Sequence, residues 1–180
     1  MVATRRVAML ALTAMMLGVG TSGSRAYAQP GPLRPDQAFQ TLKSFVGDWQ
    51  GVTESGRQFQ VSYRLTANDT VLIETWTMSP TRQSMTVYHM DGEALIATHY
   101  CPQGNQPRLQ YRADTSNERL HFTFRDATNL PDPNVAHQHE FWIRRHADGT
   151  FARNETYLEN GEAGSETATL TRPLAPPNNP

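Results

Sequence analysis

The fold of this chain is decided by residues 59–65, which read FQVSYRL. Apolar and polar residues alternate strictly along this stretch, and a period of two is typical of a β-strand with one buried face. The same alternation returns at Leu120, Phe122 and Phe124, and residues 71–78 are rich in β-branched and aromatic side chains. These segments predict antiparallel strands that bury one face and expose the other.

Turn signals separate the expected strands at regular intervals. Asn, Asp and Gly tolerate the positive φ angles that tight hairpins require. Such residues form four dipeptides between alternating segments, Asn68-Asp69, Asp91-Gly92, Asp148-Gly149 and Asn160-Gly161. We therefore expect an all-β domain of eight to ten strands joined by hairpins. An up-and-down barrel avoids exposed edges most simply, and a two-sheet sandwich is the alternative.

One short helix is expected before the first strand, in residues 35–46. Pro35 and Asp36 provide a favourable helix start. An apolar face follows at helical spacing, made by Phe39, Leu42, Phe45 and Val46.

The longest loop is predicted over residues 126–136, which read DATNLPDPNVA. Its two prolines do not fit a central strand, because proline cannot donate a hydrogen bond to the neighbouring strand. Long loops often form the walls of binding sites, although a solvated turn explains this one equally simply.

The first 28 residues have the three parts of a secretory signal. Arg5 and Arg6 precede an apolar run from Val7 to Val19, and the segment closes with the small-x-small sequence of residues 26–28. The apolar run is too short to span a bilayer. We expect export to the periplasm or out of the cell, with no membrane span after cleavage. A linker (29–34), one barrel domain (35–172) and a disordered tail (173–180) should follow.

Composition narrows the functional classes. The 180 residues include 17 acidic and 16 basic side chains, which gives no excess of positive charge for nucleic acid. The single cysteine, Cys101, excludes an intrachain disulfide and every zinc module that needs several cysteines. The chain also lacks a Gly-x-Ser-x-Gly elbow, a phosphate-binding loop and a dinucleotide fingerprint. Binding is therefore a simpler hypothesis than catalysis, and the enzyme question stays open.

Three short motifs resemble a group of uncharacterised bacterial proteins of the lipocalin-like, or calycin, type. The Gly47-Asp48-Trp49 sequence follows the expected helix and resembles the Gly-x-Trp that starts the first strand in these barrels, where the Trp plugs one end. The other two motifs are Thr98-His99-Tyr100-Cys101 with Asn105-Gln106-Pro107-Arg108, and later His137-Gln138-His139. The resemblance, over residues 36–171, implies the fold but no agreed activity. Glu155 departs from it, because an aromatic residue is expected there.

We expect the barrel to enclose a small-molecule ligand, which is hydrophobic if apolar walls dominate the cavity. Alternation predicts that the inward-facing side chains include Phe59, Val61 and Leu72. The residues expected to contact the ligand are Glu74, Trp76, His99, Arg108, Phe122, His139 and Phe141. Among them, Glu74 lies between apolar neighbours, so its carboxyl group, if buried, could act as a general acid or base. The alternatives are an interior ion pair with an arginine, for example Arg108 or Arg112, and a position on the solvent face.

A metal site is the alternative hypothesis. In a strand, residues two positions apart share a face, so His99 lies beside Cys101 and His137 beside His139. If both strands turn these faces inward, the four side chains could bind zinc or copper, as a metal-binding protein or a metal-dependent enzyme. An interior polar network explains the same residues without a metal. Haem bound through His99 or His139 is a less favoured hypothesis than the metal site or the polar network, because the chain is too polar for a large apolar cavity.

Overall fold

A computed structural model describes residues 31–114 and 119–173 of the chain. The expected signal segment and all but the first residue of the expected tail lie outside these residues. The described residues form one helix, α1 (Pro35–Lys43), and ten strands. The strands are β1 (Gly47–Thr53), β2 (Gln58–Thr66), β3 (Val71–Ser79), β4 (Arg82–Asp91), β5 (Ala94–Tyr100), β6 (Gln106–Arg112), β7 (Leu120–Thr128), β8 (His137–Arg145), β9 (Phe151–Glu159) and β10 (Glu162–Thr171).

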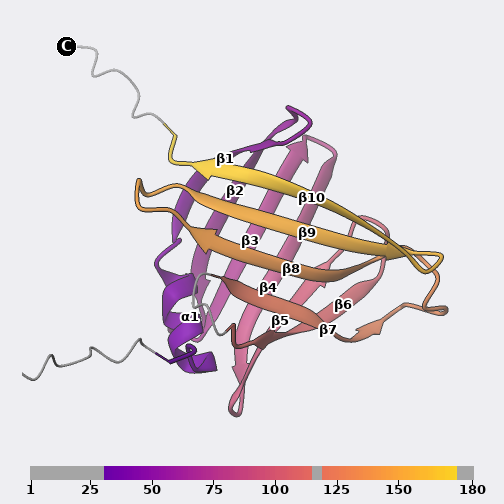
Figure 1. Ribbon diagram of the computed structural model, residues 1–180, viewed down its shortest axis with the longest axis horizontal. Coiled ribbons are helices and arrows are strands. Elements are labelled where there is room, and N and C mark those ends of the chain that lie inside the picture. The colour runs from indigo at the N-terminus through magenta and orange to yellow at the C-terminus, as the bar shows by residue number, and fades with distance from the viewer. Residues whose placement is uncertain (1–30, 115–118, 174–180) are drawn as a thin grey trace, which may run out of the picture.

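The ten strands close into a barrel in which every strand pairs antiparallel with its neighbours in the sequence (Figure 1). Closure joins the first strand to the last, with Gln50 of β1 opposite Thr171 of β10. The ten described strands leave no sheet edge, which confirms the up-and-down barrel rather than the sandwich. The architecture, a closed ten-stranded barrel preceded by a short helix, is consistent with a lipocalin-like fold.

The alternation in the sequence places the core inside the barrel. Phe59, Val61 and Tyr63 of β2 are buried, while the polar residues between them face outward or are partly exposed. Leu120 and Phe122 of β7 are buried in the same way. Burial of these apolar side chains is the main favourable contribution to folding.

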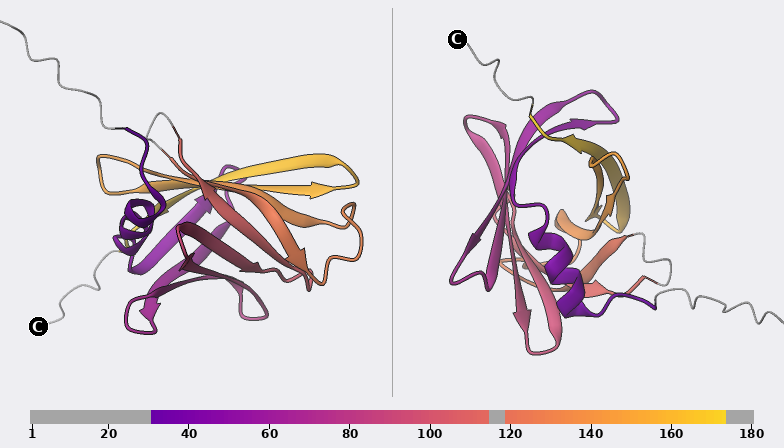
Figure 2. Two further views of the ribbon diagram at one scale, coloured as in Figure 1. Left: turned by 90° about the horizontal axis from the view of Figure 1, so that it is seen from below. Right: turned by 90° about the vertical axis from the view of Figure 1, so that its left-hand side faces the viewer.

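The helix closes one end of the barrel (Figure 2). Ala38, Phe39 and Leu42 are its buried residues. The helix ends at Lys43, earlier than the expected apolar face, and Val46 is 38% exposed. The chain leaves the helix here because Gly47, with φ at +124°, turns it into β1.

An aromatic cluster lies under the helix. The Trp49 indole Nε1 donates to the carbonyl of Phe45 at 2.7 Å. The ring of Phe151 lies 4.6 Å from that of Trp49 and 4.5 Å from that of Phe45. The guanidinium of Arg172 covers the outer side of Trp49, 3.8 Å from the ring centroid. We call this end of the barrel the closed end.

The four predicted turns join strands as expected, and the long loop is shorter than expected. Asn68, Asp69 and Asn160 have positive φ angles at their hairpins. The expectation for residues 126–128 was wrong, because β7 continues through them and pairs with β6 as far as Thr128 opposite Gln106. The loop proper spans residues 129–136.

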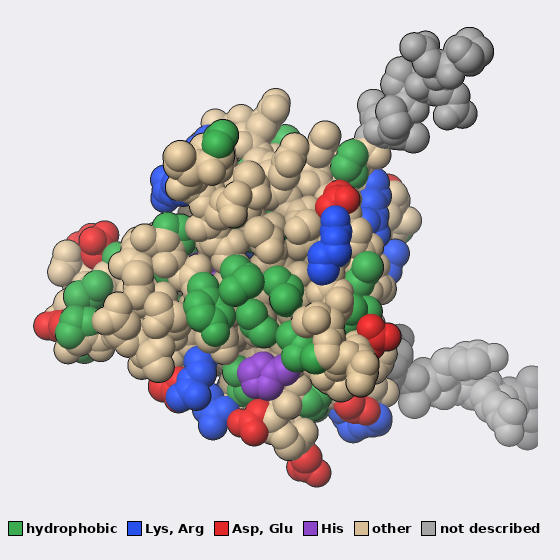
Figure 3. Space-filling model, turned by 180° about the vertical axis from the view of Figure 1, so that it is seen from behind, with side chains coloured by type: hydrophobic (Ala, Val, Ile, Leu, Met, Phe, Trp, Pro, Cys, Tyr) green, Lys and Arg blue, Asp and Glu red, His purple; other side chains and the backbone are tan. Residues whose placement is uncertain are grey.

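The outer face of the barrel carries apolar side chains on neighbouring strands (Figure 3). In the register of β3 and β4, Val71 lies opposite His89, and Ile73 lies opposite Val87. All four side chains are partly exposed. Among the described residues, no helix is long and apolar enough to cross a membrane.

Candidate binding site at the open end of the barrel

A cavity of about 780 Å³ opens at the end of the barrel opposite the helix. Its lining comes from strand ends that are far apart in the sequence, in β1 to β4, β9 and β10, and from the turn after β5. Its lining residues include Phe59, Trp76, Met78, Arg82, Cys101, Glu155, Tyr157 and Gly164. We call this hollow the mouth cavity.

A buried ion pair lies between the mouth cavity and the closed end. The side chains of Glu74 and Arg153 are both fully buried, and Arg153 Nε lies 3.3 Å from Glu74 Oε1. The same oxygen accepts from the hydroxyl of Tyr63 at 2.9 Å and from Trp76 Nε1 at 2.5 Å. The hydroxyl of Tyr88 donates to Glu74 Oε2. The two carboxylate oxygens thus accept hydrogen bonds from three side chains and form an ion pair with Arg153, which offsets much of the cost of burying the charge.

The electrostatics of this network keep its members in fixed protonation states. Burial, reinforced by the charge of Glu74, raises the pKa of Tyr63 well above its usual value. Burial likewise raises the pKa of Tyr88. Burial by itself would lower the pKa of Arg153, but Glu74 and the other acidic groups around it outweigh that effect and raise it. The two hydroxyls therefore stay donors and the guanidinium stays charged at physiological pH.

Planar groups stack across the middle of the barrel. The rings of Phe59 and Trp76 are stacked with centroids 4.4 Å apart. Arg153 lies next, with its guanidinium 5.4 Å from the Trp76 ring and 4.1 Å from the Phe141 ring. Phe141 then stacks on Phe122 at 4.6 Å. This row fills the barrel, so the mouth cavity has a solid floor and does not continue to the closed end.

Glu155 connects the floor to the cavity. Its Oε1 accepts from Arg153 Nε at 3.3 Å, from Arg153 Nη2 at 3.1 Å and from Gln138 Nε2 at 3.1 Å. The side chain is 21% exposed and lines the cavity, unlike the fully buried Glu74. Arg153 is therefore shared by two carboxylates, one in the dry floor and one at the cavity wall.

A second polar chain runs along the wall from Tyr157 to His99. The Tyr157 hydroxyl lies 3.4 Å from His99 Nε2, and Thr86 Oγ1 lies 3.0 Å from His99 Nδ1. Burial, with a further contribution from the charge of Arg153, lowers the pKa of His99 to about 4. Burial also raises the pKa of Tyr157. Both groups are consequently neutral near pH 7 and act as hydrogen-bonding groups.

Cys101 closes the wall beside Tyr157. Its Sγ donates to Gln103 Oε1 at 3.1 Å, and burial raises the pKa of the thiol. The thiolate is the reactive form of cysteine, so this residue lacks the lowered pKa of a catalytic nucleophile.

The loop of residues 129–136 braces the rim. Asn129 Nδ2 donates to the carbonyl of Gly104 at 2.7 Å, and Asn105 Nδ2 donates to the carbonyl of Ala136 at 2.9 Å. The amide of Asn160 donates to the carbonyl of Asn134 at 2.9 Å. The loop thereby ties the turn after β5 to the turn between β9 and β10.

The residues expected to contact a ligand do not lie together. Trp76 lines the mouth cavity. Glu74, Phe122 and Phe141 belong to the packed floor, and His99 lies behind Tyr157. Arg108 faces the outside of the barrel, where it pairs with Asp126. Glu74 does form an interior ion pair with an arginine, and its partner is Arg153 rather than the two examples, Arg108 and Arg112.

The side chains proposed to bind a metal do not converge. Nδ1 of His139 lies 3.4 Å from Nε2 of His137, and both rings pack against Phe124. They lie where β7 and β8 separate, because the register between these strands stops at Thr123 opposite Glu140. His99 and Cys101 instead contact the wall of the mouth cavity. Within the described part of the chain, no three His, Cys, Asp or Glu side chains are placed to hold a metal ion. The four side chains do not all face the barrel interior, because a bulge at residues 138–140 breaks the alternation of inner and outer positions in β8.

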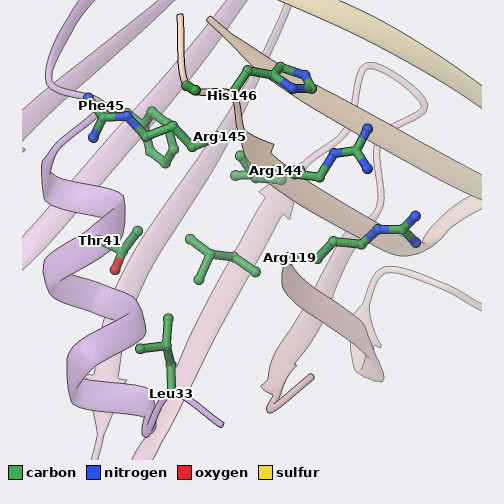
Figure 4. A pocket seen from close by; sticks show the side chains of 10 residues that line it. Leu33, Thr41, Phe45, Arg119, Arg144, Arg145 and His146 are labelled. Atoms are coloured by element: carbon green, nitrogen blue, oxygen red, sulfur yellow. The ribbon is translucent and has the colours of Figure 1, made fainter. Parts of the chain in front are cut away.

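A second hollow, of about 570 Å³, lies at the closed end between α1 and strands β7 and β8 (Figure 4). Leu33 and Phe45 contribute to its apolar lining. Arg119 and Arg144 extend side by side away from the helix in this view. The Thr41 hydroxyl donates to the carbonyl of Gln37 at 3.0 Å. Arg145 and His146 also line this hollow, so its charged groups are basic, and its lining in the described residues has no carboxylate such as Glu155.

The sequence contained a signal for the residues of β9 that were missed. Phe151, Arg153, Glu155 and Tyr157 occupy alternate positions of β9, so extending the alternation from Phe151 would have placed them all inside the barrel. Nothing in the sequence indicated that Arg153 would meet Glu74, because their strands lie on different sides of the barrel.

Comparison of the chain with known protein families and with curated proteins gives no match.

Proposed function

We propose that this protein binds a small organic molecule in the mouth cavity. One observation carries the proposal: a hollow of about 780 Å³ opens at one end of a barrel whose middle is packed. Ligand sites are typically concave hollows of roughly 300–1,000 Å³ with apolar walls and a few polar groups. Met78 and the edges of Phe59 and Trp76 would supply the apolar surface, and Glu155 and Tyr157 the orienting groups.

Binding fits this site better than catalysis for a physical reason. Tyr157, Cys101 and His99 lack the shifted pKa values that would activate them for nucleophilic or acid–base chemistry. Its hydroxyl and thiol groups, Tyr157 and Cys101, have raised pKa values because they are buried, and His99 has a lowered one. Tyr157 and Cys101 would contact a ligand in their neutral forms, with the neutral His99 behind Tyr157.

A cavity-filling variant tests the proposal. Gly164 lines the cavity, and a Cβ atom added there would meet no heavy atom within 4 Å. Gly164→Phe should therefore place a ring in the cavity without disturbing the wall. Ala163→Phe is the matched control, because Ala163 is the exposed neighbour on the opposite face of β10.

The measurement is a screen of small organic molecules by ligand-observed NMR and thermal shift. Compounds that bind the wild-type protein should bind Ala163→Phe equally well and lose binding to Gly164→Phe. The proposal is overturned if no compound binds the wild-type protein, or if the compounds that bind it also bind Gly164→Phe.

We also propose that the protein is exported, on the basis of the charged, apolar and small-residue parts of residues 1–28. Fractionation of cells that express the full chain, with N-terminal sequencing of the product, tests this. The expected product begins at Gln29 and lies outside the cytoplasm. A product in the cytoplasm that keeps residues 1–28 would exclude export.

A further inference from the structure

The inner part of the mouth cavity has an excess of negative charge. Glu74 and Glu155 share a single guanidinium, that of Arg153. The three groups together carry a formal charge of −1 in a region where two of the side chains are fully buried. An uncompensated charge in such surroundings is costly, and a cation that enters the cavity would reduce that cost.

Two oxygen atoms at the same wall accept no hydrogen bond from the described residues, one on Glu155 and one on Gln138. The hydrogen bonds that Glu155 accepts from described residues all reach its Oε1. Behind it, the fully buried Gln138 uses its Nε2 on Glu155 and has no partner for its Oε1. Buried polar atoms normally have partners, so a hydrogen-bond donor is the missing group here.

The cations around the cavity do not supply that donor. Arg57 is paired with Glu166 across the rim. Arg82 is exposed and forms none of the ion pairs found among the described residues. Solvent screens a charge in that position, whereas it screens a charge at the wall less effectively. Tyr157 and Cys101 keep their protons because burial raises the pKa of each.

We propose that the mouth cavity selects organic cations, with a protonated amine against the free oxygen of Glu155 and an apolar group beside Met78. This inference rests on the proposed function and specifies the ligand class of the same site. An ammonium group has three donors, so it can satisfy Glu155 and neighbouring acceptors together. Phe59 and Trp76 are stacked on each other and offer their edges, so Glu155 rather than an aromatic cage recognises the charge.

Three probes of similar size test the charge preference by calorimetry and NMR titration: 2-phenylethylamine, 2-phenylethanol and 3-phenylpropanoate. The amine should bind the wild-type protein at least about tenfold more tightly than the alcohol or the carboxylate, a difference of about 1.4 kcal/mol. Glu155→Gln should weaken amine binding by about tenfold and leave alcohol binding unchanged. The matched control Glu162→Gln, at an exposed site in the adjoining hairpin, should leave all three unchanged.

The outcomes separate this inference from the proposed function. Equal binding of amine and alcohol, lost in Gly164→Phe, would keep the cavity as a binding site and exclude selection of cations. Tightest binding of the carboxylate, reduced by Arg82→Gln, would show that the rim sets the charge preference and would overturn the inference. Absence of amine binding to the wild-type protein would overturn it as well. The comparison of probes needs only the wild-type protein, so it holds even if Glu155→Gln fails to fold.

Discussion

The two ends of the barrel are built from the same strands and are filled differently. At the closed end, Phe45, Trp49 and Phe151 pack ring against ring beneath the helix. At the open end, Arg57 and Glu166 pair at the rim of a cavity of about 780 Å³. The difference appears along a single strand, because the inward positions of β9 change from an aromatic ring to a buried cation and then to a carboxylate at the cavity wall.

This comparison assigns the two halves different tasks. The closed end and the floor supply the apolar burial that stabilises the fold. The open end contributes less apolar burial, so it can hold polar groups and an unfilled cavity. The buried pair of Glu74 and Arg153 marks the boundary, since it is the last layer from which water is excluded. Substitutions on either side of this boundary should therefore differ strongly in their effect on stability.

The largest effect is expected for Arg153→Met. The substitution leaves the fully buried Glu74 without a cation, and breaking a buried ion pair in this way costs about 3–5 kcal/mol. Urea unfolding should show this loss in the free energy of unfolding. The double variant Arg153→Met/Glu74→Gln should recover part of it, because the amide removes the unpaired charge. A single variant as stable as the wild-type protein would mean that water reaches Glu74, and the boundary between the two ends would not exist.

The fold could be predicted from the sequence because it depends on local patterns. Alternation at Phe59, Val61 and Tyr63 gave a strand with one inner face, and dipeptides such as Asn160-Gly161 gave the hairpins. Local patterns do not locate β-bulges, because a bulge adds only one residue to a strand and does not change the composition of the segment. The end of β7 and the faces of His137 and His139 were misjudged for that reason.

The site was harder to predict because it depends on which strands meet across the barrel. The sequence placed Glu74 on an inner face correctly, and the structure gave it a partner from β9. Inward-facing aromatic residues such as Phe122 and Phe141 were expected to line a cavity, and they stack to fill it instead. Packing of this kind follows from the summed volumes of many side chains, which alternation alone does not determine.

Leu42→Ala at the closed end should have the next largest effect. Leu42 is fully buried under the helix, so its truncation should cost about 3 kcal/mol through lost burial and the cavity left behind. Met78→Ala at the open end should cost about 1 kcal/mol, because Met78 is already partly exposed in the mouth cavity. Guanidinium unfolding of both variants measures the difference. Equal costs would indicate that the mouth is packed as densely as the core.

His99, beside the wall of the mouth cavity, should make the free energy of unfolding depend on pH. Its pKa is lowered to about 4 in the folded protein, mainly by burial, against an ordinary value of 6.5. The unfolded chain therefore binds more protons between these values, so stability is complete above pH 6.5 and falls as the pH is lowered toward 4. At pH 5 the loss should be about 2 kcal/mol. Unfolding curves at pH 7 and pH 5 measure it.

His99→Asn is the control for this prediction, because asparagine keeps hydrogen-bonding groups but does not titrate. The variant should lose most of the dependence between pH 7 and pH 5. His139 also has a lowered pKa, from burial and from His137, and accounts for a smaller residual. If the variant keeps the full dependence, His99 is hydrated through the mouth cavity and does not belong to the dry wall.

The smallest effect is expected for Arg57→Gln, which breaks the ion pair at the rim. Arg57 and Arg153 each pair with a glutamate, and their side chains are 65% and 0% exposed, respectively. An exposed pair contributes less than about 1 kcal/mol, because water competes for both charges and the side chains lose freedom when they pair. The cost should shrink further in about 1 M salt, where charges are screened beyond roughly 3 Å. Urea unfolding at low and high salt measures both values. A loss of stability close to that of Arg153→Met and unaffected by salt would mean that the rim excludes water as the floor does. The proposed difference between the two ends would then be wrong.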